Sequence, residues 1–424
     1  MSDSTPPKLR PLGISTPLDG SEGAVRLSDP LGLRPQGPGP DIDIPPAEWA
    51  ILRRFDGERG SSEIAEAATD ELGRSVSVAE VDQLVTRASD LLLLEDQTYE
   101  RALDRAFDEF RRQAIRPAVG PGRDYEQNGF DLRVRIGGLV ADEWDLPPLP
   151  QAQGLWTPAA PLGMAGPVYS RAWAAVRHCR SAIDRVVLMG SVGAPLDSLL
   201  VPLAKPFETP LGQVAVDSEA LAALGHLPGR DQLAHRDSLE LERQLLFVRL
   251  LFPELPVVPL LVSSPNRAVG TPEAWETREC DEVERAVVGL RAVLELEGRT
   301  LVIAAADCYR RGHARAGSKL DAPRGTILGG HLGGRIRDAD REAIDAATRL
   351  DPDGFIAVAF DDEDPARAAL AAAPYLMLRT LEGRQSYAPL EDDEEPEPVR
   401  GSTLGYLPMP GAGQVSTAAA VVFH

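Results

Sequence analysis

The fold is decided by residues 185–193, which read RVVLMGSVG. The four apolar residues 186–189 run directly into a Gly-Ser-Val-Gly turn. A short apolar run with paired valines is typical of a strand buried on both faces of a parallel sheet. In open α/β sheets the ligand-binding groups lie beyond the carboxyl ends of such strands, so residues 191–193 should border the cleft. Ser191, Val192 and Gly193 offer few ligand-binding groups, so little chemistry is expected at this central position.

The segments around this strand predict an α/β domain over residues 115–424, with a mostly parallel sheet flanked by helices. Residues 115–156 are rich in Pro and Gly and predict irregular connections. Beyond them, apolar residues at helical spacing alternate with short apolar runs. The predicted helices are 169–179, 218–224, 238–252, 280–296, 341–350 and 366–381, and the predicted strands are 186–189, 257–262, 300–306 and 415–423, with another near Tyr406.

The N-terminal part predicts a poorly ordered arm, residues 1–40, and a small helical domain, residues 41–112. The arm is rich in Pro, Gly and Ser and has one short strand pattern near residues 24–27. Three helices are predicted after it: one opens at Pro46, the second ends at Gly73, and the third begins with the capping box of Ser77 and Glu80. Three short helices followed by an extended segment predict a winged-helix-like domain.

The composition excludes several classes of partner. Hydrophobic residues make up 43% and charged residues 26% of the chain, as in an ordinary globular protein, and the formal net charge is −21. Such a negative charge disfavours nucleic acids and anionic membranes, because both bind through clustered Lys and Arg. No apolar stretch approaches the ~20 residues of a spanning helix, so no membrane partner is expected.

The three cysteines, Cys179, Cys280 and Cys308, are odd in number and widely spaced. This pattern predicts neither a disulfide framework nor a Cys-x-x-Cys zinc site. The opening residues lack the apolar core of a secretory signal. The expected location is therefore the cytoplasm.

Common catalytic motifs are absent from the sequence. There is no Walker A motif, no His-Glu-x-x-His and no Gly-x-Gly-x-x-Gly after a strand. The run GGHLGG at residues 329–334 could cradle an anion, but it lacks a preceding strand and a Lys, and a flexible loop is expected. The turn at Ser191 is a near miss for a hydrolase nucleophile elbow, with Met189 in place of the first Gly. As a nucleophile Ser191 would need His235; the alternative is a polar turn residue.

Residues 41–112 resemble PqqD-like domains, notably at residues 55–57 (FDG) and in the helix after Ser77. These domains hold peptides in peptide-modifying systems, so the resemblance implies a peptide or protein partner. Acidic residues outnumber Lys and Arg about two to one in this segment, which argues against a DNA-reading role. The alternative is a structural cap on the larger domain.

Six sequence blocks beyond residue 115 follow one another in a specific order: AGPVY at 165–169, RVVLMGS at 185–191, FETPLG at 207–212, SLE at 238–240, VIAAAD at 302–307 and LRTLEG at 378–383. This order resembles the Memo family, the B component of AmmeMemoRadiSam systems. The resemblance implies a fold like that of the class III (extradiol) non-haem iron dioxygenases. It also implies a metal bound through His and Cys, with a redox role that is not settled.

The positions that would carry the family's metal ligands differ in this chain. The resemblance places the first His on Ala159, the next on Gly193, and two further His on Asp237 and Arg310. The late Cys falls on Ala369. Transition metals select imidazole and thiolate donors, so these residues do not predict a working metal centre.

Other residues could rebuild a metal site: His235, Asp237, Asp307, Cys308 and His313. The alternatives without a metal are an exposed surface residue for His235 and a small buried apolar residue for Cys308. His313 lies in an Arg-rich segment that would repel a cation. A guanidinium grips carboxylates and keeps its charge, so Arg310 is expected to replace the cation and pair with Asp237 or Asp307. The alternative places Arg310 in solvent.

These patterns predict a degenerate Memo-like protein without catalytic activity, which works as a binding or scaffold protein and needs no cofactor. A metal-dependent redox enzyme with displaced ligands, holding iron, copper or zinc, is the alternative. A hydrolase built on Ser191 is a weaker alternative.

Overall fold

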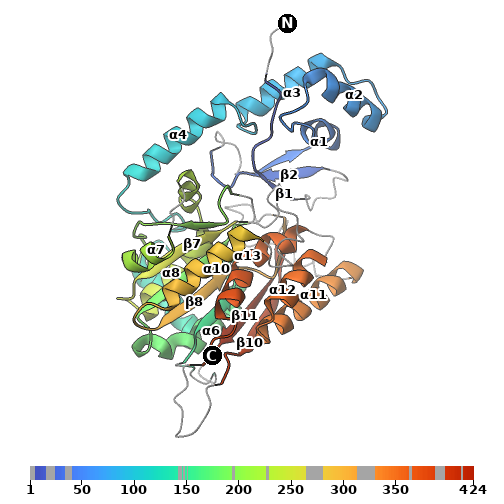
Figure 1. Cartoon of the computed structure of the whole chain (residues 1–424). Coiled ribbons are helices and arrows are strands. Elements are labelled where there is room, and N and C mark those ends of the chain that lie inside the picture. Colours follow the sequence, from blue (N-terminus) through green and yellow to red (C-terminus); the bar gives the residue numbers. More distant parts are fainter. Residues whose placement is uncertain are drawn as a thin grey trace. The chain divides into compact units, whose positions relative to one another are not determined.

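The computed structural model describes residues 5–15, 24–33, 41–141, 146, 149, 151–192, 196–225, 229–263, 280–312, 330–361, 365–386, 397–411 and 414–424. The chain divides into two compact units, Met1–Arg112 and Gln113–His424 (Figure 1). Each unit has its own hydrophobic core.

The N-terminal unit combines a small antiparallel sheet with four helices. The sheet has the order β1-β2-β3, so β1 and β3 are its edge strands in the described part of the unit. The elements are β1 (Gly13–Ser15), β2 (Val25–Ser28), β3 (Asp41–Ile44), α1 (Pro46–Leu52), α2 (Ser61–Leu72), α3 (Val78–Asp90) and α4 (Gln97–Arg112).

Local signals explain the boundaries of these helices. Pro46 stands at the first position of α1, where a missing backbone N–H is harmless. Gly73 ends α2 in the left-handed conformation, at φ 61°, that a residue with a side chain rarely adopts. The Ser77 hydroxyl accepts a hydrogen bond from the Glu80 N–H and so caps α3. These three helices confirm the sequence-based prediction.

The segment expected to form an arm contributes to this unit. The predicted strand near residues 24–27 is observed as β2, and β1 pairs with it. Leu12 and Leu27 belong to the same buried cluster as Ile51, Ile64 and Val81 from the helices. A buried ion pair joins Arg10 and Asp29 at 2.9 Å. The strands of this sheet therefore precede the helices in the chain, and they complete the core.

The larger unit contains an eight-stranded sheet. Seven of its strands follow the order β10-β11-β4-β8-β5-β7-β6, and the eighth, β9, pairs with β11. The four neighbouring strands β4, β8, β5 and β7 are parallel, and the outer strands are antiparallel to their neighbours. The strands are β4 (Gly154–Thr157), β5 (Arg185–Ser191), β6 (Leu200–Pro202), β7 (Val257–Val262), β8 (Thr300–Ala305), β9 (Tyr309–Gly312), β10 (Gly401–Gly411) and β11 (Gln414–Phe423).

Helices cover both faces of this sheet, which explains why β5, β7 and β8 are buried along their whole length. None of the described helices is both long and apolar enough to cross a membrane. The helices are α5 (Gly129–Ala141), α6 (Leu162–Val176), α7 (Ser218–Ala223), α8 (Leu239–Leu251), α10 (Asp281–Leu294), α11 (Gly330–Thr348), α12 (Pro352–Asp361) and α13 (Pro365–Leu381), with short 3-10 turns η1 (Arg177–Ser181) and η2 (Arg230–His235).

The two helical layers pack on alternate residues of the strands. Val187 and Met189 of β5 join the core beneath α10, α13, α12 and α11, which lie side by side in Figure 1. On the other face, Gly190 lies against α8, where an added Cβ would come within 2.9 Å of Leu241. There the ring of Phe247 stacks on Trp173 at 5.1 Å, which packs α8 against α6.

Most predicted helices and strands of this unit are observed near their expected positions, and several elements were not predicted. Residues 115–156 are not wholly irregular, because they contain α5 and the start of β4. Gly330 and the residues after it begin α11 rather than forming a flexible loop. The pattern also missed α12, β6 and β9 in this unit, and α4 in the N-terminal unit.

A fragment of residues 1–112 is expected to unfold cooperatively in urea, followed by circular dichroism. A shorter fragment, residues 41–112, should not, because it lacks Leu12, Leu27 and two of the three strands. Burial of each leucine contributes about 1.5–3 kcal/mol, a large share of the stability of so small a unit. If the longer fragment shows no cooperative transition, the unit is a cap that depends on the rest of the chain.

Candidate functional site

The candidate site lies at the carboxyl edge of the parallel strands. β4 ends at Thr157 and leads into Pro158–Ala160, while β8 ends at Ala305 and leads to Asp307. These strands are hydrogen-bonded neighbours in parallel register, so both turns meet at one edge of the sheet. Hydrogen bonds from the side chains of α8 reach the same turn. This is the edge where ligands bind in open α/β sheets.

Asp307 uses both carboxylate oxygens in hydrogen bonds. Its Oδ1 accepts the backbone N–H groups of Ala159 and Ala160, each at 3.0 Å. Its Oδ2 accepts Nε of Arg310 at 3.0 Å and Nη2 of Arg310 at 2.6 Å. The side chain of Asp307 is fully buried, and four donors compensate for the water it has lost. No oxygen of this carboxylate is left without a donor.

Arg310 therefore pairs with Asp307, as the sequence led us to expect. Nε and Nη2 of its guanidinium both donate to the same oxygen, Oδ2 of Asp307. Burial opposes the charge on Arg310, but the Asp307 carboxylate and then that of Glu240 outweigh it and raise the pKa of the guanidinium. A permanent positive charge thus lies at this edge.

Asp237 makes a different contact. Its side chain is 60% exposed, and its carboxylate accepts Nε of its neighbour Arg236 at 2.9 Å. An exposed pair of this kind contributes little to stability. Of the two carboxylates considered for Arg310, the ion pair observed is the one with Asp307.

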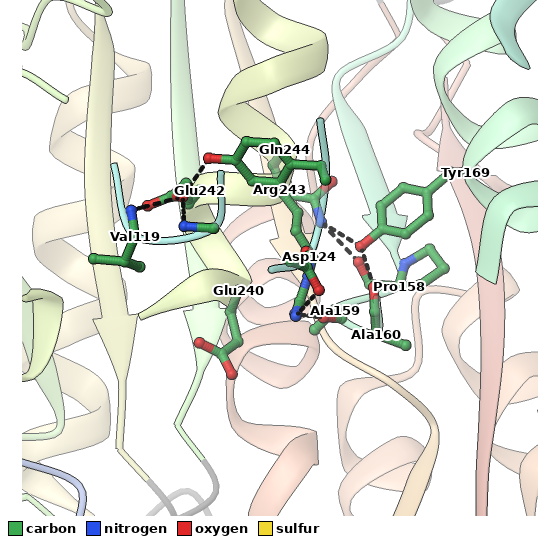
Figure 2. A network of polar contacts seen from close by, with 12 residues as sticks. Val119, Asp124, Pro158, Ala159, Ala160, Tyr169, Glu240, Glu242, Arg243 and Gln244 are labelled. Atoms are coloured by element: carbon green, nitrogen blue, oxygen red, sulfur yellow. Dashed lines mark hydrogen bonds and ion pairs between the residues drawn. The ribbon is translucent and has the colours of Figure 1, made fainter. Parts of the chain in front are cut away.

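Side chains also donate hydrogen bonds to the backbone carbonyls of the turn that carries Ala159 (Figure 2). Gln244 Nε2 donates to the Pro158 carbonyl at 2.7 Å, Arg243 donates to that of Ala159, and the Tyr169 hydroxyl donates to that of Ala160 at 3.0 Å. Arg243 also forms a parallel pair of bonds to Asp124, at 2.7 and 2.9 Å. The turn is therefore rigidly placed by buried polar side chains.

A second buried ion pair supports the start of α8. Arg116 bonds Glu242, and neither side chain is exposed. Glu242 also accepts the N–H of Gly120 at 2.7 Å and the hydroxyl of Tyr125. Burial lowers the pKa of Arg116 to about 10. Because this value is still well above neutral pH, the guanidinium stays charged. Sequence reasoning missed these partners, although the polar run 242–244 within a buried helix was a signal of them.

Ser191 has a structural role. Its hydroxyl donates to the Leu370 carbonyl at 2.7 Å and accepts the Ala373 N–H at 3.0 Å. Pro374 lies inside α13 and has no N–H for the carbonyl four residues earlier, which is that of Leu370. Ser191 supplies the donor that the proline lacks. With both of these bonds made, the hydroxyl is not placed as a nucleophile beside His235.

His235 is fully buried, contrary to the expected exposed surface position. Its Nε2 contacts the Val201 carbonyl at 2.7 Å, so Nε2 carries the proton, and Nδ1 has no partner among the described residues. Burial lowers the pKa of His235 to about 3; the bond to Val201 opposes this shift and the Arg116 charge adds to it. The imidazole is neutral at physiological pH and inaccessible to solvent.

The remaining candidates give no cluster of metal donors in the described residues. Cys308 is buried, and burial, followed by the nearby Asp340 carboxylate, raises the pKa of its thiol, which disfavours the thiolate. The described ranges contain no group of three or more His, Cys, Asp or Glu that could hold a metal ion. Gly193, His313 and the side chain of Ala369 lie outside the described residues.

Replacing Ser191 with Ala should lower the free energy of unfolding by about 1–3 kcal/mol, because two buried backbone groups lose a partner. In a Pro374→Ala background the loss should be smaller, since residue 374 then supplies an N–H to Leu370. Urea denaturation of the four proteins measures this coupling, expected at about 0.5 kcal/mol or more. Equal losses in both backgrounds would show that Ser191 does not serve the proline site.

The stability of the protein should fall as the pH decreases below about 6.5, the pKa of an unfolded histidine. Between that value and about 3, the unfolded state binds a proton at residue 235 that the folded state excludes. One such group contributes up to about 1.4 kcal/mol per pH unit. A His235→Gln variant should therefore show a shallower slope near pH 5–6.

The exposed His178 provides the control for this measurement. His178→Gln should keep the wild-type slope. His424, whose pKa burial also lowers, leaves a residual slope in both variants. An unchanged slope in His235→Gln would contradict the assignment.

Comparisons with known proteins found a family model and two relatives that match this chain. A family model described as "Memo-like protein" matches residues 116–362. The chain is 24% identical to a MEMO1 family protein of Aquifex aeolicus over 241 residues, which are 56% of this chain and 62% of the relative. It is 27% identical to a MEMO1 family protein of Thermus thermophilus over 219 residues, 50% of this chain and 65% of the relative. The chain thus spans just under two thirds of the length of these curated relatives. Because the family model matches more than half of its residues, the chain belongs to the Memo-like family.

Proposed function

We propose that this chain is a Memo-family protein whose metal centre has been replaced by an internal ion pair, and that it works by binding a partner. The ion pair of Arg310 and Asp307 carries the proposal. A guanidinium supplies, from within the chain, the positive charge that a bound cation would supply to this edge. The site is then structurally complete without a metal.

The residues present do not fit a divalent metal ion. The side chain of Ala159 has no atom that can bind a metal. Its backbone N–H and carbonyl are already hydrogen-bonded to Asp307 and Arg243. Arg310 repels a cation, and Asp307 has no oxygen without a donor. Asp237 offers only an exposed carboxylate beside Arg236. A transition metal needs several donors that are both basic and accessible.

A metal-dependent redox enzyme with displaced ligands is the second candidate. It would have to use His235 or Cys308, together with His313. His235 is buried and its Nε2 is hydrogen-bonded to the backbone carbonyl of Val201. Burial raises the pKa of the Cys308 thiol and so keeps it protonated. The third candidate, a hydrolase, would need Ser191 to give up both bonds to α13. These contacts favour the binding role over both enzymes.

The N-terminal unit is the proposed place for the partner. Its sheet has two edge strands, β1 and β3, in the part of the unit that the structure describes. Edge strands carry backbone groups that can pair with an extended peptide. With its PqqD-like sequence, the unit would present a peptide or protein to a system of the AmmeMemoRadiSam type. The negative charge of the chain makes nucleic acids and membranes unsuitable partners, and a cytoplasmic setting suits the free cysteines.

Protein purified without chelators is expected to hold far less than one iron, copper or zinc ion per chain. Elemental analysis by mass spectrometry measures the metal directly. The metal content should not change in Arg310→Met, which removes the charge, since the other donors are still missing. Stoichiometric metal that is lost in His235→Gln or Cys308→Ser would contradict the proposal and favour an enzyme with displaced ligands.

A further inference from the structure

A second charged feature lies at the opposite edge of the sheet from Asp307. Arg400 precedes β10, whose first residue, Gly401, is paired with Phe423 of β11. Phe423 in turn is paired with Gly154, the first residue of the parallel strand β4. This edge therefore holds the amino ends of the parallel strands, whereas Asp307 follows a carboxyl end. The two features are separated by the length of the strands.

A cavity of about 440 Å³ opens at this edge. Three arginines line it, Arg349, Arg384 and Arg400, and no Asp or Glu lies among the lining residues described. Such a concentration of positive charge is unusual in a chain with 65 acidic and 44 basic residues. Leu350, Pro398 and Val399 form an apolar part of the wall. The volume is in the range of small-molecule sites.

The backbone fixes the position of these arginines. The Val399 N–H donates to the Arg384 carbonyl at 3.0 Å, and Arg400 exchanges two backbone hydrogen bonds of 3.0 Å with His424. Arg384 Nε also donates to Gln153 Oε1 at 3.3 Å. Arg349 Nη2 lies 3.8 Å from Asp351 Oδ2, which is a weak contact. Among the described residues, the arginines are therefore held close to one another without a strong salt bridge at Arg349.

Two helix ends partly oppose the positive charge. α11 ends at Thr348 and α13 ends at Leu381, so both carboxyl ends adjoin the cavity. Each helix end carries about half a negative charge. Against these two half charges, the lining residues described carry three guanidinium groups. Complementing the helix ends does not need all three arginines.

We propose that this cavity binds a small phosphate monoester. A phosphate monoester carries about −1.5 to −2 charges at pH 7 and three acceptor oxygens, which suits a cavity lined by arginines. Arginine binds such groups through planar pairs of N–H donors. The cavity is larger than a phosphate group alone, and its apolar wall at Leu350, Pro398 and Val399 can cover the organic part. This site is independent of the proposed function at the carboxyl edge.

Phosphate suits these arginines better than carboxylate does. A phosphate group concentrates nearly two charges on one centre and offers three acceptor oxygens, whereas a carboxylate carries one charge and two oxygens.

Isothermal titration calorimetry with ribose 5-phosphate tests the proposal. The full chain should bind this probe, with an affinity that falls as salt is added. The double variant Arg349→Gln/Arg400→Gln should bind it at least tenfold more weakly. Both arginines are exposed, so their replacement should leave the fold intact, which circular dichroism checks. Arg133→Gln, an exposed arginine on α5, is the matched control and should bind like the wild type.

Several outcomes would overturn the proposal. Absence of binding at millimolar ribose 5-phosphate excludes the site, and an equal loss in Arg133→Gln reduces it to a non-specific charge effect. Equal binding of ribose would show that the phosphate is not recognised. Equal binding of citrate would make the site a general anion site, and equal binding of inorganic phosphate would remove the role of the organic part.

Discussion

Charge buried inside the larger unit must be paired, and this requirement governs the arrangement around α8. Glu242, Arg243 and Gln244 are consecutive polar residues in a helix whose neighbouring residues form the core. Each of them reaches a different segment: the first bonds Arg116, the second Asp124, and the third the Pro158 carbonyl. Removing one partner of a buried pair typically costs about 3–5 kcal/mol. The segments before β4 and after it are therefore fixed by the same helix.

This constraint extends to the carboxyl edge. Arg243 and Gln244 hold the carbonyl side of the turn after β4, and Asp307 holds two of its N–H groups. Arg310 then balances the charge of Asp307. A continuous set of hydrogen bonds thus runs from Asp124, through the backbone of the turn, to Arg310. The rigidity of the edge comes from these polar contacts, in addition to the apolar packing beneath it.

The sequence predicted the centre of the fold well because the central strands are buried on both faces. β5, β7 and β8 each contain a continuous apolar run of four to six residues, which is a usual length for a strand and too short for most helices. α5 was missed because Gly137 and Gly138 interrupt it and because Phe130 and Val134 are exposed, which obscures its apolar face. β9 was missed because it is a short polar strand that exists through its pairing with β11.

The candidate site shows the same division between local and long-range information. The pair of Asp307 and Arg310 could be predicted because the two residues are three positions apart at a strand end. The pair of Asp124 and Arg243 could not, since 119 positions separate its members. For Ser191 the sequence left two interpretations open, a nucleophile with His235 or a polar turn residue, because its partner is a carbonyl in α13 that only the fold brings near. Pattern reasoning identified residue types, and the topology decided which of them meet.

Under the proposed function, the ion pair at the carboxyl edge would also make it difficult for a single substitution to create a metal site here. Replacing Arg310 by a metal ligand removes the positive charge and leaves the buried Asp307 carboxylate with two N–H donors. A cation entering there must then find further donors, yet Ala159 has none and Asp237 points to solvent beside Arg236. Each half of the exchange, loss of the guanidinium or gain of a ligand, is unfavourable without the other. The arrangement is therefore stable towards single changes, and the fold persists around a centre that has its own charge balance.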